Sequence, residues 1–111
     1  ADMVAHTGNF SATQKAVTIL DEAIKKIVDV VEKRKGVMVV TADHGNAERM
    51  IHLSTGEVLT QHSTNPVPCI VIGSGKKKLR RKNGTLADVT PTILTLLGKE
   101  VPEQMTGQSI I

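Results

Sequence analysis

The sequence has almost no aromatic side chains: Trp and Tyr are absent, and Phe10 is the only Phe. Aromatic residues often dominate core packing, so the core of this protein should consist of Val, Ile, Leu and Met. The basic run Lys76–Lys82 has no aromatic side chain that could stack on a base, which weighs against nucleic-acid binding. A solvated loop explains the run more simply, and we expect no nucleic-acid partner.

Long hydrophobic runs are also missing. No apolar stretch approaches the roughly 20 residues that span a bilayer, and the opening residues ADMVAHTG lack the charged and apolar regions of a signal peptide. We therefore expect no membrane partner and a cytoplasmic location. Cys69 is the only cysteine and cannot form an internal disulfide, as is usual in a reducing compartment. Its apolar neighbours predict a small buried strand residue.

The remaining composition is that of a soluble globular protein. Of the 111 residues, 40% are hydrophobic and 23% are charged, which predicts a single domain over residues 1–111 with no internal boundary.

One long amphipathic helix is predicted from Ser11 to Lys35, because apolar residues recur there at spacings of three and four. Ser11 and Gln14 form a capping-box pattern at its start. Gly36 follows two cations and predicts a glycine stop at its end. The expected apolar face consists of Ala16, Val17, Leu20, Ile24, Ile27, Val28 and Val31.

Short apolar runs predict two buried strands, at residues 37–41 and 69–72, since both faces of each are apolar. Residues 50–53 and 57–60 flank a Ser-Thr-Gly turn and predict a small hairpin. A helix followed by a buried strand points to an α/β fold. Two strands and a hairpin make a thin sheet, so we expect the chain to be part of a larger sheet whose other strands come from sequence outside it.

A last helix is predicted near the end of the chain. It should begin near Asp88 or Thr90, carry Pro91 in its first turn and stop at Gly98. The residues expected to face inward are Ile93, Leu94, Leu96 and Leu97.

Polar residues follow the first predicted strand at once. Asp43 and His44 stand at its carboxyl end, where open α/β sheets bind ligands. Their side chains would point to opposite faces of a continuing strand, so both reach one ion only if the strand ends near Ala42 and the backbone turns, which Gly45 makes easy. An Asp helix cap followed by a surface His explains the pair equally well.

Two further histidines favour a metal site. Asp2 and His6 are four residues apart, a spacing that puts both on one face of a helix, and His62 shortly precedes the second predicted strand. Imidazole and carboxylate ligands suit Zn, Mn or Fe. Together with the Asp-His pair above, these ligands exceed those of one ordinary site. Two adjacent ions are therefore the simplest interpretation, and paired ions favour phosphoryl transfer or hydrolysis.

Other polar residues nearby are less informative. His52 lies in the predicted hairpin with no other ligand type beside it, and we interpret it as a surface residue. Asn46 and Glu48 could orient the neighbouring Asp-His pair, a support that metal sites commonly require. They could equally be turn residues.

Four motifs occur in the order found in one enzyme family: D-M-V-A-H-T-G, T-A-D-H-G-N-A-E, Q-H-S-T-N-P-V-P and a tail from L-A-D-V-T-P to M-T-G-Q-S-I-I. From Ala1 to Ile111, the chain resembles the C-terminal segment of the cofactor-independent (2,3-bisphosphoglycerate-independent) phosphoglycerate mutases, in the alkaline phosphatase superfamily. The resemblance implies a three-layer α/β/α fold. This chain would hold part of an alkaline-phosphatase-like sheet, incomplete on its own.

The resemblance also implies a site and a reaction. Asp2, His6 and His62 match positions that hold one Mn²⁺ ion in the family, and Asp43 and His44 match positions that hold the second. The family's reaction interconverts 3-phosphoglycerate and 2-phosphoglycerate through a phosphoserine, without bisphosphoglycerate. The parent protein would be an isomerase of glycolysis and gluconeogenesis. Its partners would be the small-molecule phosphoglycerate and, for this segment, the remainder of the same protein.

The chain departs from the family pattern in two ways. Ala5 stands where the family usually has Gly, a change that we expect to be tolerated. The nucleophilic serine is expected upstream of this chain, so no catalytic residue is assigned here and the chain alone should be inactive. The alternatives are a segment of a related metal-dependent phosphatase or phosphopentomutase, and a non-catalytic metal-binding module. None of the serines of this chain occupies the nucleophile's motif. They are Ser11, Ser54, Ser63, Ser74 and Ser109.

Overall fold

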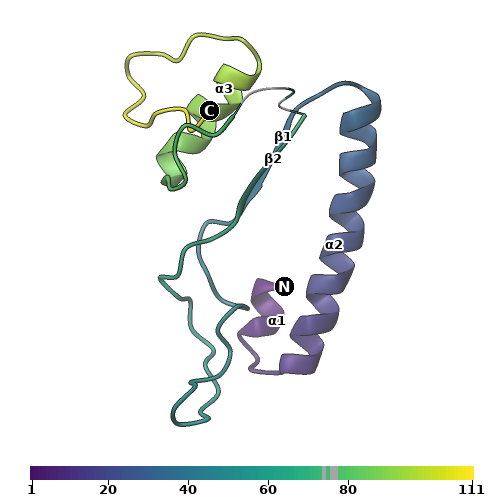
Figure 1. Cartoon of the computed structure of the whole chain (residues 1–111). Coiled ribbons are helices and arrows are strands. Elements are labelled where there is room, and N and C mark those ends of the chain that lie inside the picture. Colours follow the sequence, from purple (N-terminus) through teal and green to yellow (C-terminus); the bar gives the residue numbers. More distant parts are fainter. Residues whose placement is uncertain (74, 76–77) are drawn as a thin grey trace. The chain divides into compact units, whose positions relative to one another are not determined.

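A computed structural model describes residues 1–73, 75 and 78–111. Ser74, Lys76 and Lys77 lie outside the described residues, and with them part of the basic run 76–82. None of the helices in the described ranges is long and apolar enough to cross a membrane. In chain order the elements are α1 (Asp2–Ala5), α2 (Phe10–Lys33), β1 (Met38–Thr41), β2 (Cys69–Ile72), the 3-10 helix η1 (Leu86–Asp88) and α3 (Val89–Leu96) (Figure 1).

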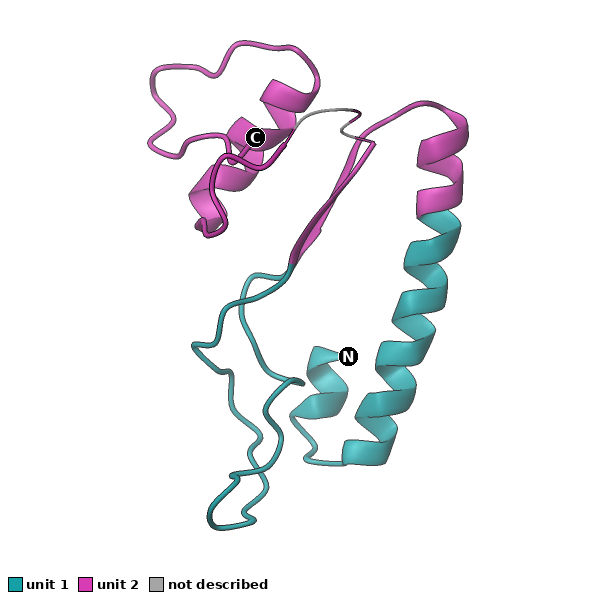
Figure 2. Ribbon diagram, viewed as in Figure 1, with its two compact units in different colours: residues 1–27, 42–68 teal, residues 28–41, 69–111 magenta. Residues whose placement is uncertain are grey.

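The chain divides into two compact units (Figure 2). Unit 1 consists of residues 1–27 and 42–68, and unit 2 consists of residues 28–41 and 69–111. Every residue that the sequence nominates as a metal ligand belongs to unit 1. The expectation of one domain over residues 1–111 stays a prediction.

Helix α2 forms within two residues of its predicted bounds, but its first cap differs from the prediction. Asn9 caps the helix, because its Oδ1 accepts a hydrogen bond from the backbone N–H of Ala12 at 2.9 Å and its carbonyl accepts one from Thr13 at 3.0 Å. Ser11 lies inside the helix, whose first residue is Phe10. The predicted capping box is therefore wrong, because the cap residue is Asn9 and precedes Ser11 by about half a helical turn.

The end of α2 is also shifted relative to the prediction. Lys35, at φ +52°, takes the left-handed conformation that was expected of Gly36. The N–H of Lys35 donates to the carbonyl of Glu32 at 2.9 Å, and the N–H of Gly36 donates to that of Val31 at 2.8 Å. These two bonds form a Schellman motif, in which glycine is the usual left-handed residue.

Lys35→Gly should raise the stability of the folded protein by about 0.5–1 kcal/mol. A side chain in the left-handed region costs roughly 1–2 kcal/mol, and part of the gain is lost to the larger backbone freedom of glycine in the unfolded chain. Thermal or urea unfolding followed by circular dichroism would measure the change. Gly36→Ala is the matched control, since its added Cβ meets Val31 only at 3.4 Å. A Lys35→Gly variant no more stable than the natural protein would contradict the left-handed conformation assigned to Lys35.

The apolar face of α2 is present but mostly uncovered by the described residues. Val17, Leu20 and Ile27 are each about half exposed, at 45%, 49% and 52%. The expected aliphatic core is correspondingly small. The buried hydrophobic residues are Ala5, Met50 and Ile111.

Both predicted strands are present, β2 with the predicted bounds and β1 one residue shorter at its start, but neither is buried. They pair antiparallel in a two-stranded sheet, with Met38 opposite Ile72 and Thr41 opposite Cys69. Cys69 is exposed, against prediction. A pair of strands leaves a free edge on each side and cannot cover its own faces, so residues patterned for a buried sheet stay half-exposed here.

The predicted hairpin exists only as a short turn. Ile51 and Val58 form one isolated antiparallel bridge. The N–H of His52 donates to the carbonyl of Glu57 at 2.8 Å, and the N–H of Leu59 donates to that of Met50 at 2.8 Å. The pairing is too brief to form two strands.

Helix α3 carries Pro91 in its first turn and is followed by Gly98 at φ +66°, both as predicted. Its inward face is different from the prediction: Pro91 and Thr92 are buried, whereas Leu97 is 56% exposed. Thr92 Oγ1 donates to the carbonyl of Asp88 at 2.6 Å and accepts from the N–H of Ile110 at 3.1 Å. The C-terminal tail therefore lies on the threonine side of the helix, and Ile93, Leu94 and Leu96 are only half-buried.

Asp88 binds this C-terminal tail through hydrogen bonds. Its Oδ1 accepts the N–H of Gln108 at 2.7 Å, and its Oδ2 accepts the N–H of Thr85 at 2.8 Å. Arg81 Nη2 lies 3.2 Å from Oδ1. The hydrogen bonds from Gln108 and Thr85, followed by Arg81, lower the pKa of Asp88 from 3.8 to about 2 against the opposing effect of burial.

Asp88→Asn should lower the melting temperature at neutral pH by several degrees. The side-chain NH₂ of asparagine would face one of the two backbone N–H groups, those of Gln108 and Thr85, from which Asp88 accepts hydrogen bonds. A carboxyl whose pKa is depressed on folding stabilises the protein fully above its unfolded value of 3.8, and this contribution is lost as pH falls through about 2. The melting temperatures of the two proteins should therefore converge below pH 4. A difference in melting temperature that stays constant from pH 6 to pH 2 would contradict this explanation. Asp21→Asn, at an exposed position of α2, is the matched control.

Candidate metal centre

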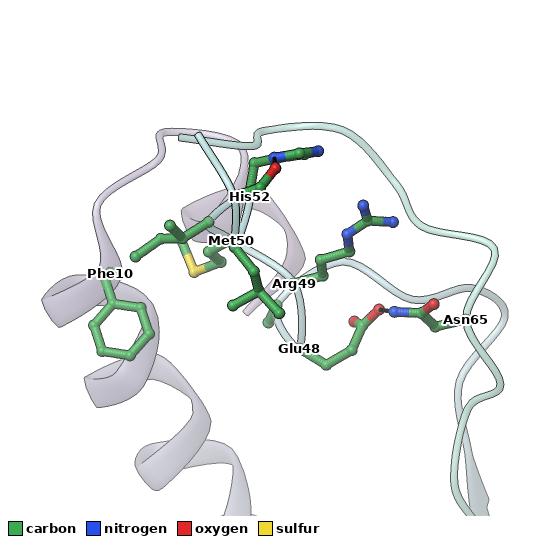
Figure 3. A pocket seen from close by; sticks show the side chains of 10 residues that line it. Phe10, Glu48, Arg49, Met50, His52 and Asn65 are labelled. Carbon is green, nitrogen blue, oxygen red and sulfur yellow. Dashed lines mark hydrogen bonds between the residues drawn. The ribbon is translucent and has the colours of Figure 1, made fainter. Parts of the chain in front are cut away.

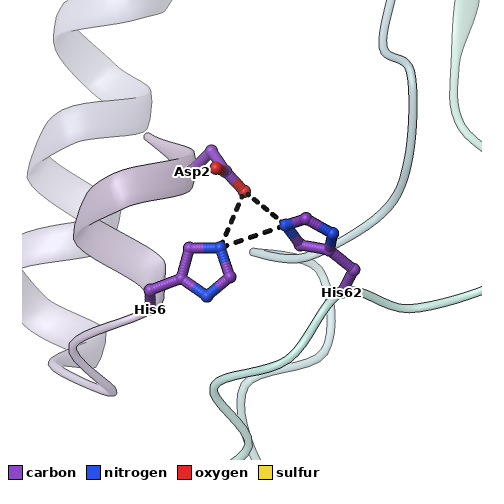
Figure 4. A group of neighbouring side chains, drawn as sticks. All are labelled: Asp2, His6 and His62. Atoms are coloured by element: carbon purple, nitrogen blue, oxygen red, sulfur yellow. Dashed lines mark hydrogen bonds and ion pairs between the residues drawn. The ribbon is translucent and has the colours of Figure 1, made fainter.

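Three side chains from distant parts of the sequence meet in unit 1 (Figure 4). Asp2 begins α1, His6 follows its last turn, and His62 lies in the segment that leads to β2. His6 Nε2 lies 3.0 Å from His62 Nε2, and Asp2 Oδ1 lies 3.5 Å from each of these nitrogens. The four-residue spacing of Asp2 and His6 does place them on one side of a helical turn, as predicted.

The triangle of ligand atoms has the dimensions of a metal site. The point equidistant from its three corners lies about 1.9 Å from each, close to the roughly 2.0–2.2 Å of zinc–nitrogen and zinc–oxygen bonds. These three atoms could therefore hold one ion together. The three side chains are partly exposed, at 52%, 39% and 49% in chain order, so such an ion would be reachable.

The ring of His6 is held in the orientation that a ligand needs. Its Nδ1 lies 2.6 Å from the carbonyl oxygen of Thr60, which can only accept, so we assign the ring proton to Nδ1. Nε2 then carries the lone pair and faces the centre of the triangle. Metal-binding histidines generally donate their second N–H to an oxygen in this way.

Asn46 contacts Asp2 at the carboxylate oxygen that also faces the two histidines. Its Nδ2 donates to Asp2 Oδ1 at 2.6 Å, and Asn46 itself is only 6% exposed. This hydrogen bond is the main reason why the pKa of Asp2 lies below its ordinary value, with His6 and His62 adding to it and partial burial opposing it. The carboxylate is therefore charged and oriented toward the two imidazoles. Sequence reasoning gave Asn46 a supporting role toward the Asp43–His44 pair, whereas its contacts lie with Asp2.

Glu48 joins the two loops that carry the cluster. Its Oε2 accepts the N–H of Asn46 at 2.6 Å, and its Oε1 accepts hydrogen bonds from Ser63 Oγ and, at 3.0 Å, from Asn65 Nδ2. The bond from Ser63 is the largest cause of the lowered pKa of Glu48. The N–H of Ser63 also donates to the carbonyl of Gly45 at 2.7 Å. His62 is thereby fixed beside the turn that follows β1.

Gly45 has a different role from the one that its sequence position indicates. It does not adopt a positive φ. A Cβ at this position would overlap Ser63 Oγ and Glu48 Oε1. Glycine leaves room here for the hydrogen-bonded side chains of Ser63 and Glu48, which a Cβ would force to move.

Asp43 and His44 lie next to the triangle but outside it. Strand β1 ends at Thr41, as the metal interpretation requires. His44 Nε2 lies 3.6 Å from Asp43 Oδ2, near enough for both to bind one ion. The ring of His44 stacks on that of His62 with centroids 3.6 Å apart, so the two groups of ligand residues are in contact.

A hollow of about 620 Å³ adjoins this loop region (Figure 3). Phe10, Met50 and His52 line it together with Glu48 and Asn65, and none of the five nominated ligands does. The ring of His52 makes a hydrogen bond between Nδ1 and Ser54 Oγ at 3.1 Å. His52 is partly buried, whereas the sequence predicted a surface residue.

Sequence reasoning did not identify three contributors: Thr60, Ser63 and Asn65. Thr60 acts through its backbone carbonyl, which leaves no signal in the side chain. Ser63 and Asn65 both follow His62 in the run H-S-T-N-P. Small polar side chains directly after a candidate ligand are the one available sign of a hydrogen-bonded loop.

Comparison with known proteins gives a consistent result. The profile of the metalloenzyme superfamily matches residues 1–101. A protein of Acetivibrio thermocellus named 2,3-bisphosphoglycerate-independent phosphoglycerate mutase is 53% identical over 99% of this chain and 21% of its own length. A Methanosarcina barkeri protein named 2,3-bisphosphoglycerate-independent phosphoglycerate mutase 2 is 54% identical over the same shares. The chain thus spans about a fifth of the length of these relatives.

A solved structure matches as well. A crystal structure of Leishmania mexicana phosphoglycerate mutase at low cobalt concentration superposes with a TM-score of 0.84 and 37% sequence identity, over 99% of this chain and 23% of the other. These matches confirm the resemblance stated from the motifs. They also confirm the expected incomplete α/β fold of the alkaline-phosphatase type.

Proposed function

The chain belongs to the metalloenzyme superfamily, and from this premise we propose that it is the metal-binding, C-terminal segment of a cofactor-independent phosphoglycerate mutase. The observation that carries the proposal is the convergence of Asp2, His6 and His62 within metal-ligand distances of one another. Relatives at about half identity bear the mutase name. The full protein is then an isomerase that interconverts 3-phosphoglycerate and 2-phosphoglycerate.

We assign the ligands as follows. Asp2, His6 and His62 hold the first ion, in support of which the Nδ1 of His6 is already engaged by Thr60. Asp43 and His44 supply part of the second site, whose other ligands come from the remainder of the protein. Asn46 and Glu48 orient the ligands, and their hydrogen bonds to Asp2 and to the His62 loop are the basis for that role. No catalytic nucleophile is assigned within this chain.

The ions are proposed to be Mn²⁺, two in the intact protein. Mixed imidazole and carboxylate ligands accept several first-row metals, and the Leishmania mexicana relative was crystallised at low cobalt concentration. When bound, such a pair of ions supplies charge stabilisation for phosphoryl transfer and activates a hydroxyl nucleophile. In this chain the Thr60 carbonyl engages Nδ1 of His6 and leaves its Nε2 for the ion, and Asn46 holds the Asp2 carboxylate beside the two imidazoles.

The substrate, pathway and location follow from the same proposal. The small-molecule partner is a phosphoglycerate, the pathway is glycolysis and gluconeogenesis, and the location is the cytoplasm. No bisphosphoglycerate is required, because the phosphoryl group is carried by a serine elsewhere in the protein. This segment alone is inactive, since half of the second site and the nucleophile are supplied from outside it.

A substrate panel tests the proposal. The full-length protein, purified with Mn²⁺ and without bisphosphoglycerate, should convert 3-phosphoglycerate to 2-phosphoglycerate faster than it acts on phosphopentoses or simple phosphomonoesters. Turnover of pentose phosphates alone would assign the related phosphopentomutase reaction. Release of inorganic phosphate as the main product would assign a phosphatase, and Mn²⁺ binding without any turnover would assign a non-catalytic metal-binding module.

A further inference from the structure

The stack between His44 and His62 connects the two groups of ligand residues. The ring centroids are 3.6 Å apart and the planes are inclined by 21°. His6 contacts the other side of the cluster in a tilted arrangement, with centroids 4.9 Å apart and an angle of 50° to His62. His62 is thus the middle ring of three.

His62 has little else to orient it. Its Nε2 faces the triangle and meets His6 and Asp2, the atoms with which it would share an ion. In the described ranges 1–73, 75 and 78–111, no hydrogen bond to its Nδ1 is found, whereas the Nδ1 of His6 is held by Thr60. The side chain is 49% exposed, so packing alone does not hold it.

His44 is held more firmly than His62, the residue on which its ring stacks. Its backbone N–H donates to Asp43 Oδ1 at 3.1 Å. The adjoining Gly45 pairs with Ser63 in an antiparallel bridge, which places His44 and His62 as diagonal neighbours on the same face of the paired segments. The Nδ1 of His44 is buried without a hydrogen-bond partner. The His44 ring thus stacks on His62 while its own Nδ1 makes no hydrogen bond, which costs free energy.

We propose that the aromatic face of His44 positions His62 for the first ion, independently of the nitrogen by which His44 contributes to the second. This inference rests on the proposed function, in which Asp2, His6 and His62 hold the first ion. Its consequence is that the affinity of the first ion depends on an aromatic ring at position 44 rather than on a ligand there. Phenylalanine should serve as well as histidine, because a phenyl ring keeps the stack and removes the unsatisfied nitrogen.

The test uses the full-length protein in an Asp43→Asn background. Asparagine retains an oxygen for the N–H of His44 but lacks the charge that the second ion needs, so Mn²⁺ titration calorimetry reports the first ion. His44→Phe should leave the Mn²⁺ dissociation constant within about twofold, whereas His44→Ala should raise it roughly 3- to 10-fold, the usual worth of an aromatic pair. His62→Ala in the same background should abolish the binding.

Each outcome bears on one proposition. If His62→Ala abolishes binding but His44→Ala leaves it unchanged, or if His44→Phe weakens it as much as His44→Ala, the positioning role is wrong and the metal assignment stands. If His62→Ala has no effect, the proposed metal site itself is wrong. Should His44→Ala fail to fold, NMR of ¹³C-labelled histidine decides without it: the metal-free His44→Phe protein should keep ring-current-shifted His62 protons, and their loss would overturn the proposal.

Discussion

His62→Ala should lower the mutase activity of the full-length protein by at least about a thousandfold, since the first ion loses one of its three ligands from this chain and metal stabilisation is worth several kcal/mol. His62 Nε2 lies 3.0 Å from His6 Nε2 and 3.5 Å from Asp2 Oδ1. Its ligand atom lies within 4.8 Å of those of Asp2 and His6. The isomerase rate and the manganese content of the purified protein would both fall.

The matched control is His52→Ala. His52 is also a histidine of unit 1, but its ring is hydrogen-bonded to Ser54 and stands outside the ligand cluster formed by Asp2, His6 and His62. Its replacement should leave metal content and activity within a factor of two or so, because a residue remote from the site affects it little. Loss of activity in both variants would mean that histidine substitutions disturb the fold of this region, and intact activity in His62→Ala would contradict the assignment of the first ion.

Gly45→Ala is also expected to damage the metal site, although it removes no ligand. The new Cβ would strike Ser63 Oγ and Glu48 Oε1, the two atoms whose hydrogen bond closes the loops around the site. His62 would move away from Asp2 and His6. We expect the affinity for the first ion to fall by about 10- to 100-fold, the usual effect of disturbing the groups that orient metal ligands.

A double variant tests this explanation. Ser63→Ala removes one of the two atoms that the Cβ strikes, at the expense of one hydrogen bond. In the Gly45→Ala background it should therefore cause less loss than it does alone, and a double-mutant cycle on Mn²⁺ affinity would measure the difference. Strictly additive losses would show that the overlap at Gly45 is not what disturbs the site.

Local patterns in the sequence predicted the regular elements well. The three- and four-residue spacing of apolar residues located α2, the β-branched runs located β1 and β2, and Gly98 marked the end of α3. The ends of α2 were less predictable, because Asn9 and Ser11 are comparable caps and only the backbone decides between them. Likewise Lys35 takes the left-handed conformation although glycine is its neighbour.

Burial could not be predicted from the same patterns. Val, Ile and Leu at strand and helix spacing indicate a face that is covered somewhere, and they do not say by which residues. In this chain Ile70 and Val17 remain about half exposed, and Thr92 is the deepest side chain of α3. An apolar pattern records the environment of the complete sheet, of which these two strands are one part.

The candidate site was predictable in its residue types and not in its connections. Asp43, His44 and the Asp2–His6 spacing could be recognised from chain position, since each stands at an element end. The distance between His62 and Asp2 depends on loops that approach through Gly45, Ser63 and Glu48, across more than fifty residues of sequence. No local rule predicts such a contact, and it was the family resemblance that linked these residues.

The most direct measurement is an anomalous difference map, recorded at the manganese edge, from crystals of the full-length protein grown with Mn²⁺. The account predicts one peak within bonding distance of Asp2 Oδ1, His6 Nε2 and His62 Nε2, and a second beside Asp43 and His44. Crystals of protein with demonstrated mutase activity that show no peak among Asp2, His6 and His62 would contradict it.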